Sequence, residues 1–85
     1  MQFEGAVIKE QGQTFAIVIV KPNILNSNEK DTVRQEFSKY FQNMPIILMT
    51  QNSKGIPTYY GRNDIVAFLV NLHISQIPWK KYTLS

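Results

Sequence analysis

The residues that decide the fold are Phe15-Ala16-Ile17-Val18-Ile19-Val20, an unbroken apolar run. A strand with one solvated face alternates apolar and polar residues, and this run shows no alternation. We therefore expect a strand over 13–21 that lies in the middle of a sheet, with both faces covered. Pro22 has no N–H to donate and is expected to end the ladder.

A hairpin is expected upstream of this strand. Residues 3–9 form a second β-prone run, separated from 13–21 by Glu10-Gln11-Gly12. Gly12 can adopt the positive φ that a short hairpin loop requires. The first two strands should therefore pair antiparallel.

A second hairpin is expected over 46–60. Two strand-like runs, 46–50 and 56–60, flank the turn-forming segment 51–55. Pro57 cannot donate to a ladder, which predicts an edge position for the last strand.

Two amphipathic helices are expected. The first, of about fifteen residues, follows an N-cap at Asn28 and places four apolar residues on one stripe: Val33, Phe37, Tyr40 and Phe41. The second is capped by Asn63 and presents Ile65, Phe68, Leu69 and Leu72. Each helix should cover part of the sheet.

These elements give the order ββαββα in a single small α+β domain over residues 1–85. A right-handed crossover makes the second and third strands parallel, so the sheet is expected to be mixed and four-stranded, with two helices. The tail 73–85 keeps Ile74, Ile77 and Trp79 and is expected to pack on the core.

Part of the chain resembles a known family. The segment from Met44-Pro45 to Leu72 has a proline before a strand, a hairpin, a glycine and a helix, and it resembles the closing half of a thioredoxin-like domain. The resemblance covers about a third of the chain, and the Cys-x-x-Cys site of that family is absent. It therefore implies local topology and no function.

Composition sets the remaining limits. The 85 residues include no cysteine, which excludes disulfide scaffolds and thiolate chemistry, and the N-terminus lacks the pattern of a signal peptide. We expect a cytoplasmic protein with no membrane partner. The formal charge is +3, and the excess is C-terminal: beyond Ser53, four cations (Lys54, Arg62, Lys80 and Lys81) accompany Asp64 alone.

No catalytic constellation is visible in the sequence. His73 is the only histidine and no metal-ligand spacing occurs, so no metal site and no cofactor are expected. His73 falls where the second helix should end, a position at which a cation complements the helix dipole. We expect a protein that is not an enzyme.

Two segments are candidate binding sites. The first is the turn Tyr60, Gly61, Arg62 and Asn63, where a phosphate or other anion could meet a helix N-terminus beside a guanidinium. The alternative is that Gly61 only makes the turn and Arg62 pairs with Asp64.

The second candidate lies in the tail. Trp79, Lys80, Lys81 and Tyr82 combine aromatic and basic side chains, as in proteins that bind single-stranded nucleic acids or a protein partner. The alternative is that Trp79 packs the tail onto the core.

The leading hypothesis is a non-enzymatic interaction module that self-associates as a homodimer or binds another protein. It depends on coverage of the sheet, because two helices on one face would leave the other face to a partner. If the helices lie on opposite faces, the monomer is complete. A weak nucleic-acid or anion binder is the alternative and less favoured hypothesis.

Overall fold

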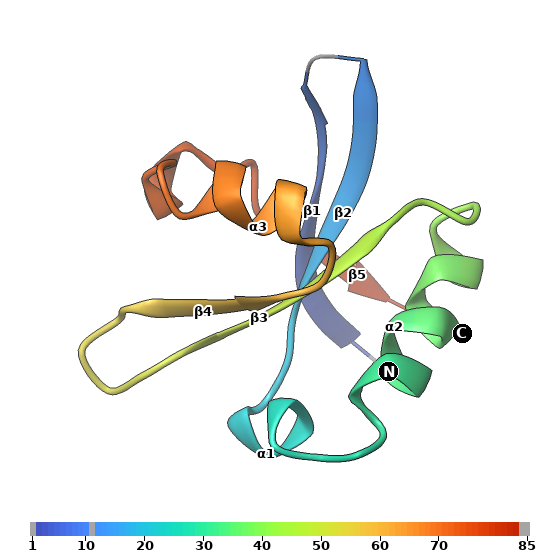
Figure 1. Cartoon of the computed structure of the whole chain (residues 1–85), viewed down its shortest axis with the longest axis horizontal. Helices are drawn as coiled ribbons and strands as arrows, with labels where there is room; N and C mark the ends of the chain where they lie inside the picture. Colours follow the sequence, from blue (N-terminus) through green and yellow to red (C-terminus); the bar gives the residue numbers. More distant parts are fainter. Residues whose placement is uncertain (1, 11, 84–85) are drawn as a thin grey trace.

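The computed structural model describes residues 2–10 and 12–83 of the chain (Figure 1). The strands are β1 (Gln2–Glu10), β2 (Gln13–Ile19), β3 (Ile46–Gln51), β4 (Pro57–Tyr60) and β5 (Lys80–Thr83). The helices are α1 (Pro22–Leu25), α2 (Lys30–Tyr40), α3 (Asn63–Leu69) and the short 3-10 helix η1 (Ile74–Gln76). The chain therefore forms a small α+β domain.

The sheet is mixed and has five strands in the order β4-β3-β2-β1-β5. The two predicted hairpins are antiparallel, β2 and β3 are parallel, β2 lies in the middle and β4 lies at an edge, all as expected. Gly12 has the predicted positive φ, at 79°. The sequence therefore predicts the central topology correctly.

The strand count and element order were wrong. The tail contains a fifth strand, β5, which pairs antiparallel with the start of β1 in the register Phe3 to Tyr82. Pro22 ends the ladder but also begins α1, a helix that the predicted order lacks. A proline at the first helical position loses no hydrogen bond, which explains why this short helix can start there.

The boundaries of the two predicted helices also differ. The α2 helix has eleven residues instead of about fifteen, and Asn28 does not cap it; Ser27 Oγ instead accepts from the N–H of Glu29 at 3.0 Å. The α2 helix ends because Gln42 and Asn43 take left-handed φ values of 58° and 64°. The α3 helix ends at Leu69, before Leu72.

The two longer helices lie on opposite sides of the sheet, as Figure 1 shows. The α3 face is the side where α3 packs on Ala6, Phe15, Ile17, Ile47 and Met49. The α2 face is the side where Phe3, Ala16, Val18, Ile46 and Leu48 meet α1 and α2. Both faces of β2 are thus covered within one chain, which removes the uncovered face on which the homodimer hypothesis depended.

The tail contributes to the α3 face before it reaches β5. Ile77 is buried there, and Trp79 packs against the same cluster, donating from Nε1 to the carbonyl oxygen of Ile74 at 3.1 Å. His73 lies at the start of η1 instead of the end of a long helix. Its Nδ1 accepts from the N–H of Ser75, so the imidazole caps η1.

Candidate functional site

Arg62 of the predicted anion site is held by the carboxylate that follows it. The guanidinium donates from Nε and Nη2 to the two oxygens of Asp64, at 3.1 and 2.6 Å, and from Nη1 to Gln13 Oε1 at 3.3 Å. This pairing lowers the pKa of Asp64, first through the hydrogen bond from Arg62. The geometry corresponds to the alternative in which Arg62 pairs with Asp64.

Close packing against β3 shapes the backbone around Arg62. The α3 helix has only seven residues, and Asn63 is its first residue, while Arg62 occupies the cap position without a side-chain cap bond. Gly61 is required for close packing: a Cβ there would overlap Ile47 Cδ1 and lie 3.0 Å from the carbonyl oxygen of Ile46. The turn is therefore built for contact with β3.

Tyr60 belongs to a different network, which joins β4 to α2. Its hydroxyl donates to Asp31 Oδ1 at 2.8 Å, and the same oxygen accepts from Arg34 Nη1 at 3.0 Å. Lys30 Nζ lies 4.3 Å from the centroid of the Tyr60 ring. The bond to Asp31 raises the pKa of the Tyr60 phenol and lowers the pKa of the Asp31 carboxyl. Tyr60 thus stabilises the link between β4 and α2.

The four predicted residues of the tail are divided between the two faces of the sheet. Trp79 packs on the α3 face, whereas Tyr82 stacks on Phe3 on the α2 face, with ring centroids 5.2 Å apart and 12° between the planes. Lys80 and Lys81 are both exposed, and Lys80 Nζ lies 5.8 Å from the centroid of the Tyr82 ring. Successive side chains of a strand point to opposite faces, so the four residues form no common stacking surface.

The two predicted sites lie far from each other. Arg62 follows β4, and Lys80 and Lys81 belong to β5, which form opposite edges of the sheet. With neighbouring strands about 4.8 Å apart, the edges are separated by roughly 19 Å. The basic residues of the C-terminal half therefore do not combine into one patch.

An apolar groove on the α2 face was not predicted. It has a volume of about 690 Å³ and lies between the start of β1, the end of β2, α1 and α2. Its walls include Phe3, Val20, Ile24, Val33 and Phe37, and its rim includes Lys21, Glu36 and Tyr40. We call it the α2 groove.

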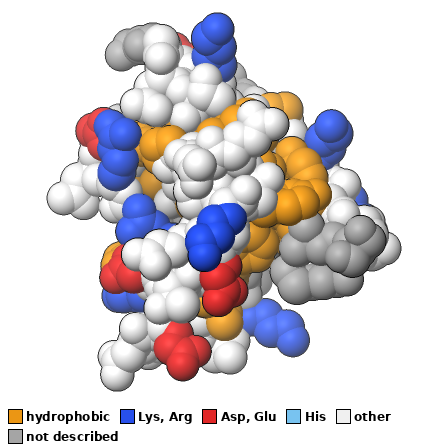
Figure 2. All heavy atoms as spheres, turned by 90° about the vertical axis from the view of Figure 1, so that its right-hand side faces the viewer, with side chains coloured by type: hydrophobic (Ala, Val, Ile, Leu, Met, Phe, Trp, Pro, Cys, Tyr) orange, Lys and Arg blue, Asp and Glu red, His pale blue; other side chains and the backbone are white. Residues whose placement is uncertain are grey.

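An aromatic cluster forms one end of this groove. Phe3 lies at its centre, with ring centroids 5.0 Å from Phe37, 5.8 Å from Tyr40 and 6.1 Å from Phe41. Tyr40 remains 43% exposed. Figure 2 looks onto the α2 side of the molecule and shows hydrophobic side chains at the surface, bordered by charged ones. The sequence predicts the apolar stripe of α2. It does not predict the contact of that stripe with Phe3, because Phe3 is distant from α2 in the sequence.

The described ranges 2–10 and 12–83 hold neither a metal-ligand cluster nor a membrane-spanning helix. They contain no group of three His, Cys, Asp or Glu side chains placed to hold a metal ion. No helix among these residues is long and apolar enough to cross a lipid bilayer. His73 contacts Ser75 and Gln76 within its own turn.

The comparisons with known proteins give no match. No family model, no curated protein and no solved structure is similar to this chain at a significant level.

Proposed function

We propose that this chain is a non-enzymatic interaction module that self-associates, and that a second copy covers the α2 groove. The observation that carries the proposal is the incomplete burial of α2. The helix has eleven residues and an apolar stripe directed at the sheet, yet none of its side chains is buried. Apolar surface that remains accessible in a groove favours association with a partner.

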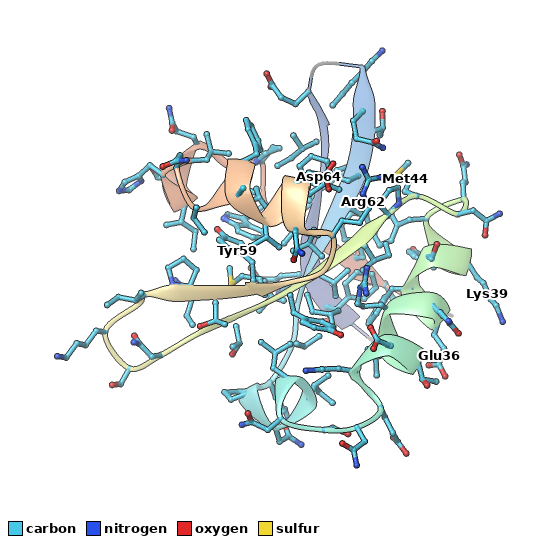
Figure 3. The ribbon with its side chains drawn as sticks, in the orientation of Figure 1. Glu36, Lys39, Met44, Tyr59, Arg62 and Asp64 are labelled. Carbon is cyan, nitrogen blue, oxygen red and sulfur yellow. The ribbon has the colours of Figure 1, made fainter. Side chains whose placement is uncertain are left out.

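The charges at the rim favour a second copy as that partner. Lys21 and Glu36 border the same groove, one cation and one anion. Figure 3 shows Glu36 and Lys39 on the outer side of α2. Around a two-fold axis each surface meets itself, so Lys21 of one copy can face Glu36 of the other. A rim without net charge gives no preference for a strongly acidic or basic partner.

The sheet edges are poorly suited to self-association, which leaves the α2 groove as the contact surface. At one edge, β4 begins with Pro57, which cannot donate a hydrogen bond. At the other edge, β5 carries Lys80 and Lys81, and two copies of this strand would place lysines beside lysines. The proposed location remains the cytoplasm, as expected from a chain without cysteine.

Sedimentation velocity between about 5 and 500 µM tests the proposal. We expect a species of twice the 9.8 kDa chain mass. Lys21→Glu and Glu36→Lys should each weaken the dimer about tenfold, equivalent to ~1.4 kcal/mol, and the double variant should restore it. A matched control, Lys54→Glu in the distant β3–β4 turn, should leave the dissociation constant unchanged. A monomer at every concentration would show that the proposal is wrong.

Nucleic-acid binding is not favoured by this arrangement. The cations expected to act together are separated between opposite sheet edges, and each phosphate contact contributes only about −0.9 to the log–log salt slope. Any association with oligonucleotides should be weak, without sequence preference, and absent at physiological salt. A nanomolar complex at about 0.2 M salt would favour the nucleic-acid hypothesis instead.

A further inference from the structure

A hollow of about 420 Å³ with polar and apolar lining lies on the other side of α2 from the groove, between α2, the loop that leads into β3, and Arg62. Its lining includes Arg34, Gln35, Asn43, Met44 and Arg62. Figure 3 shows Arg62 at the junction of β4 and α3 and Met44 in the loop before β3. Segments far apart in the sequence therefore contribute two arginines, Arg34 and Arg62, to the lining of one concave surface, which we call the arginine hollow.

Arg34 is fixed in place on one side of the hollow. Its Nε donates to the carbonyl oxygen of Ile46 at 3.1 Å, and its Nη1 donates to Asp31 Oδ1 at 3.0 Å. The side chain is only 25% exposed. A guanidinium has five N–H groups, so these two bonds leave three without an acceptor among the described residues. Arg34 is thus a preorganised donor with unused capacity.

Arg62 is held by two side-chain partners. Three N–H groups are used by Asp64 and Gln13, which leaves two of the five without an acceptor in ranges 2–10 and 12–83. Because the two arginines are held before a ligand arrives, binding need not order their side chains.

The local charge favours an anion. Among the charged residues that line the hollow, Arg34 and Arg62 are cations and Asp31 is an anion. The Oδ1 of Asp31 accepts from both Tyr60 and Arg34. This carboxylate therefore orients Arg34 and leaves the lining with a positive balance of one.

We propose that the arginine hollow binds the phosphate group of a small phosphate monoester, with Arg34 and Arg62 as the two guanidinium donors. Guanidinium groups match the geometry of phosphate oxygens, and a phosphate offers three terminal oxygens where a carboxylate offers two. The amides of Gln35 and Asn43 supply neutral donors at the same wall.

The size of the hollow indicates an organic ester instead of a bare ion. A volume of about 420 Å³ lies in the range of small-molecule sites, at roughly 300–1,000 Å³. Met44 and Pro45 add apolar lining that can contact the organic part of such a ligand. The site differs from the one predicted at the α3 N-terminus, since only Arg62 is common to both, and it does not depend on the proposed dimer.

Titration of isotope-labelled protein, followed by NMR, tests the proposal with O-phosphoserine as the probe. We expect saturable shifts of the side-chain signals of Arg34, Gln35, Asn43 and Arg62, with a Kd on the order of a millimolar. Asn43→Asp should weaken binding at least tenfold, because it adds a negative charge to the wall. Aspartate also tolerates the left-handed backbone, so this variant keeps the fold.

Two further variants and a second probe test whether binding depends on the arginine hollow and which kind of molecule carries the phosphate. Arg62→Gln should weaken binding about tenfold, whereas Lys54→Gln, which removes the same charge at a distant turn, should leave the Kd unchanged. A phosphoserine peptide that binds tenfold more tightly at the same residues would identify a protein as the source of the phosphate, and equal affinity would indicate a small metabolite. Shifts that do not saturate by 20 mM, or equal weakening by Lys54→Gln, would overturn the proposal.

Discussion

The two faces of the sheet are covered in different ways. On the α3 face a helix of seven residues buries Ile65 and Leu69 almost completely, at 4% and 0% exposure. On the α2 face a helix of eleven residues buries none of its side chains. The longer helix therefore buries less of its own apolar surface, although the strand residues Ala16, Val18 and Leu48 on its side of the sheet are fully buried. Helix length thus does not determine how far the side chains of a helix are buried.

The residues that join each helix to the sheet differ between the two faces. Gly61 lets α3 start against β3 because no Cβ stands between the turn and Ile47. The α2 helix instead rests on the large rings of Phe3, Phe37 and Phe41, which pack edge to face. The α2 groove lies beside this layer of rings, and Phe3 and Phe37 line both.

Truncation of one large side chain on each face gives the largest expected effect. Leu69→Ala on the α3 face should cost about 3 to 5 kcal/mol, because a fully buried leucine leaves a cavity. Phe37→Ala on the α2 face should cost only about 1 to 2 kcal/mol, since this ring already borders the groove. Chemical denaturation measures both values. Equal losses would remove the distinction between the faces.

Trp79 provides a second test of the α3 face. Trp79→Ala should lower the free energy of unfolding by about 2 to 4 kcal/mol, because the indole packs against the α3-face core. Trp79→Phe keeps an aromatic ring but leaves the Ile74 carbonyl without its donor, at a cost of about 1 kcal/mol. If Trp79→Ala left stability within about 0.5 kcal/mol, the tail would be dispensable for this face.

A substitution at the end of α2 should stabilise the α2 face. Gln42 has a φ of 58°, and glycine adopts this conformation without steric cost, so Gln42→Gly should gain about 0.5 to 1 kcal/mol. Asn43→Gly is the matched control and should gain less, because asparagine tolerates the left-handed region better. Thermal unfolding monitored by circular dichroism compares the two. A loss of stability in Gln42→Gly would contradict the account of the helix end.

The smallest expected effect concerns the link between β4 and α2. The hydrogen bond from Tyr60 is the largest cause of the lowered pKa of Asp31, so Tyr60→Phe should raise that pKa towards its ordinary value of about 3.9. A lowered pKa in the folded state stabilises the protein above this value and loses that contribution as the pH falls through the folded pKa. NMR titration of the carboxyl carbons measures the shift. The pKa of Asp64, set first by Arg62, should not change.

The central sheet could be predicted because its signals are local. The run 15–20 and the turn at Gly12 each identify their element without reference to distant residues. The β5 strand could not be found this way, because Lys80–Thr83 is short and its partner is residues 2–5 at the other end of the chain. The sequence also did not determine which face of the sheet each helix packs on, since an apolar stripe is compatible with either face.

The candidate site was predictable only in part. The sequence suggests Arg62 as an anion ligand at the α3 N-terminus, and the structure pairs it with Asp64 and Gln13 and includes it in the lining of the arginine hollow. The arginine hollow depends on Arg34, whose fixing partner is the backbone carbonyl of Ile46, twelve positions later. Every residue carries a backbone carbonyl, so the sequence has no signal that would identify this contact of Arg34.

The pairing of β1 with β5 has a consequence for protein synthesis. Residues 2–5 leave the ribosome early, yet their β5 partner, residues 80–83, is translated last among the described residues. Until then one edge of β1 has no neighbour and Phe3 lacks the ring of Tyr82. At about 5 to 20 residues per second this interval lasts several seconds. The nascent chain therefore displays an unpaired strand edge and the ring of Phe3 during that time, and a chaperone that recognises unpaired strands could bind it then.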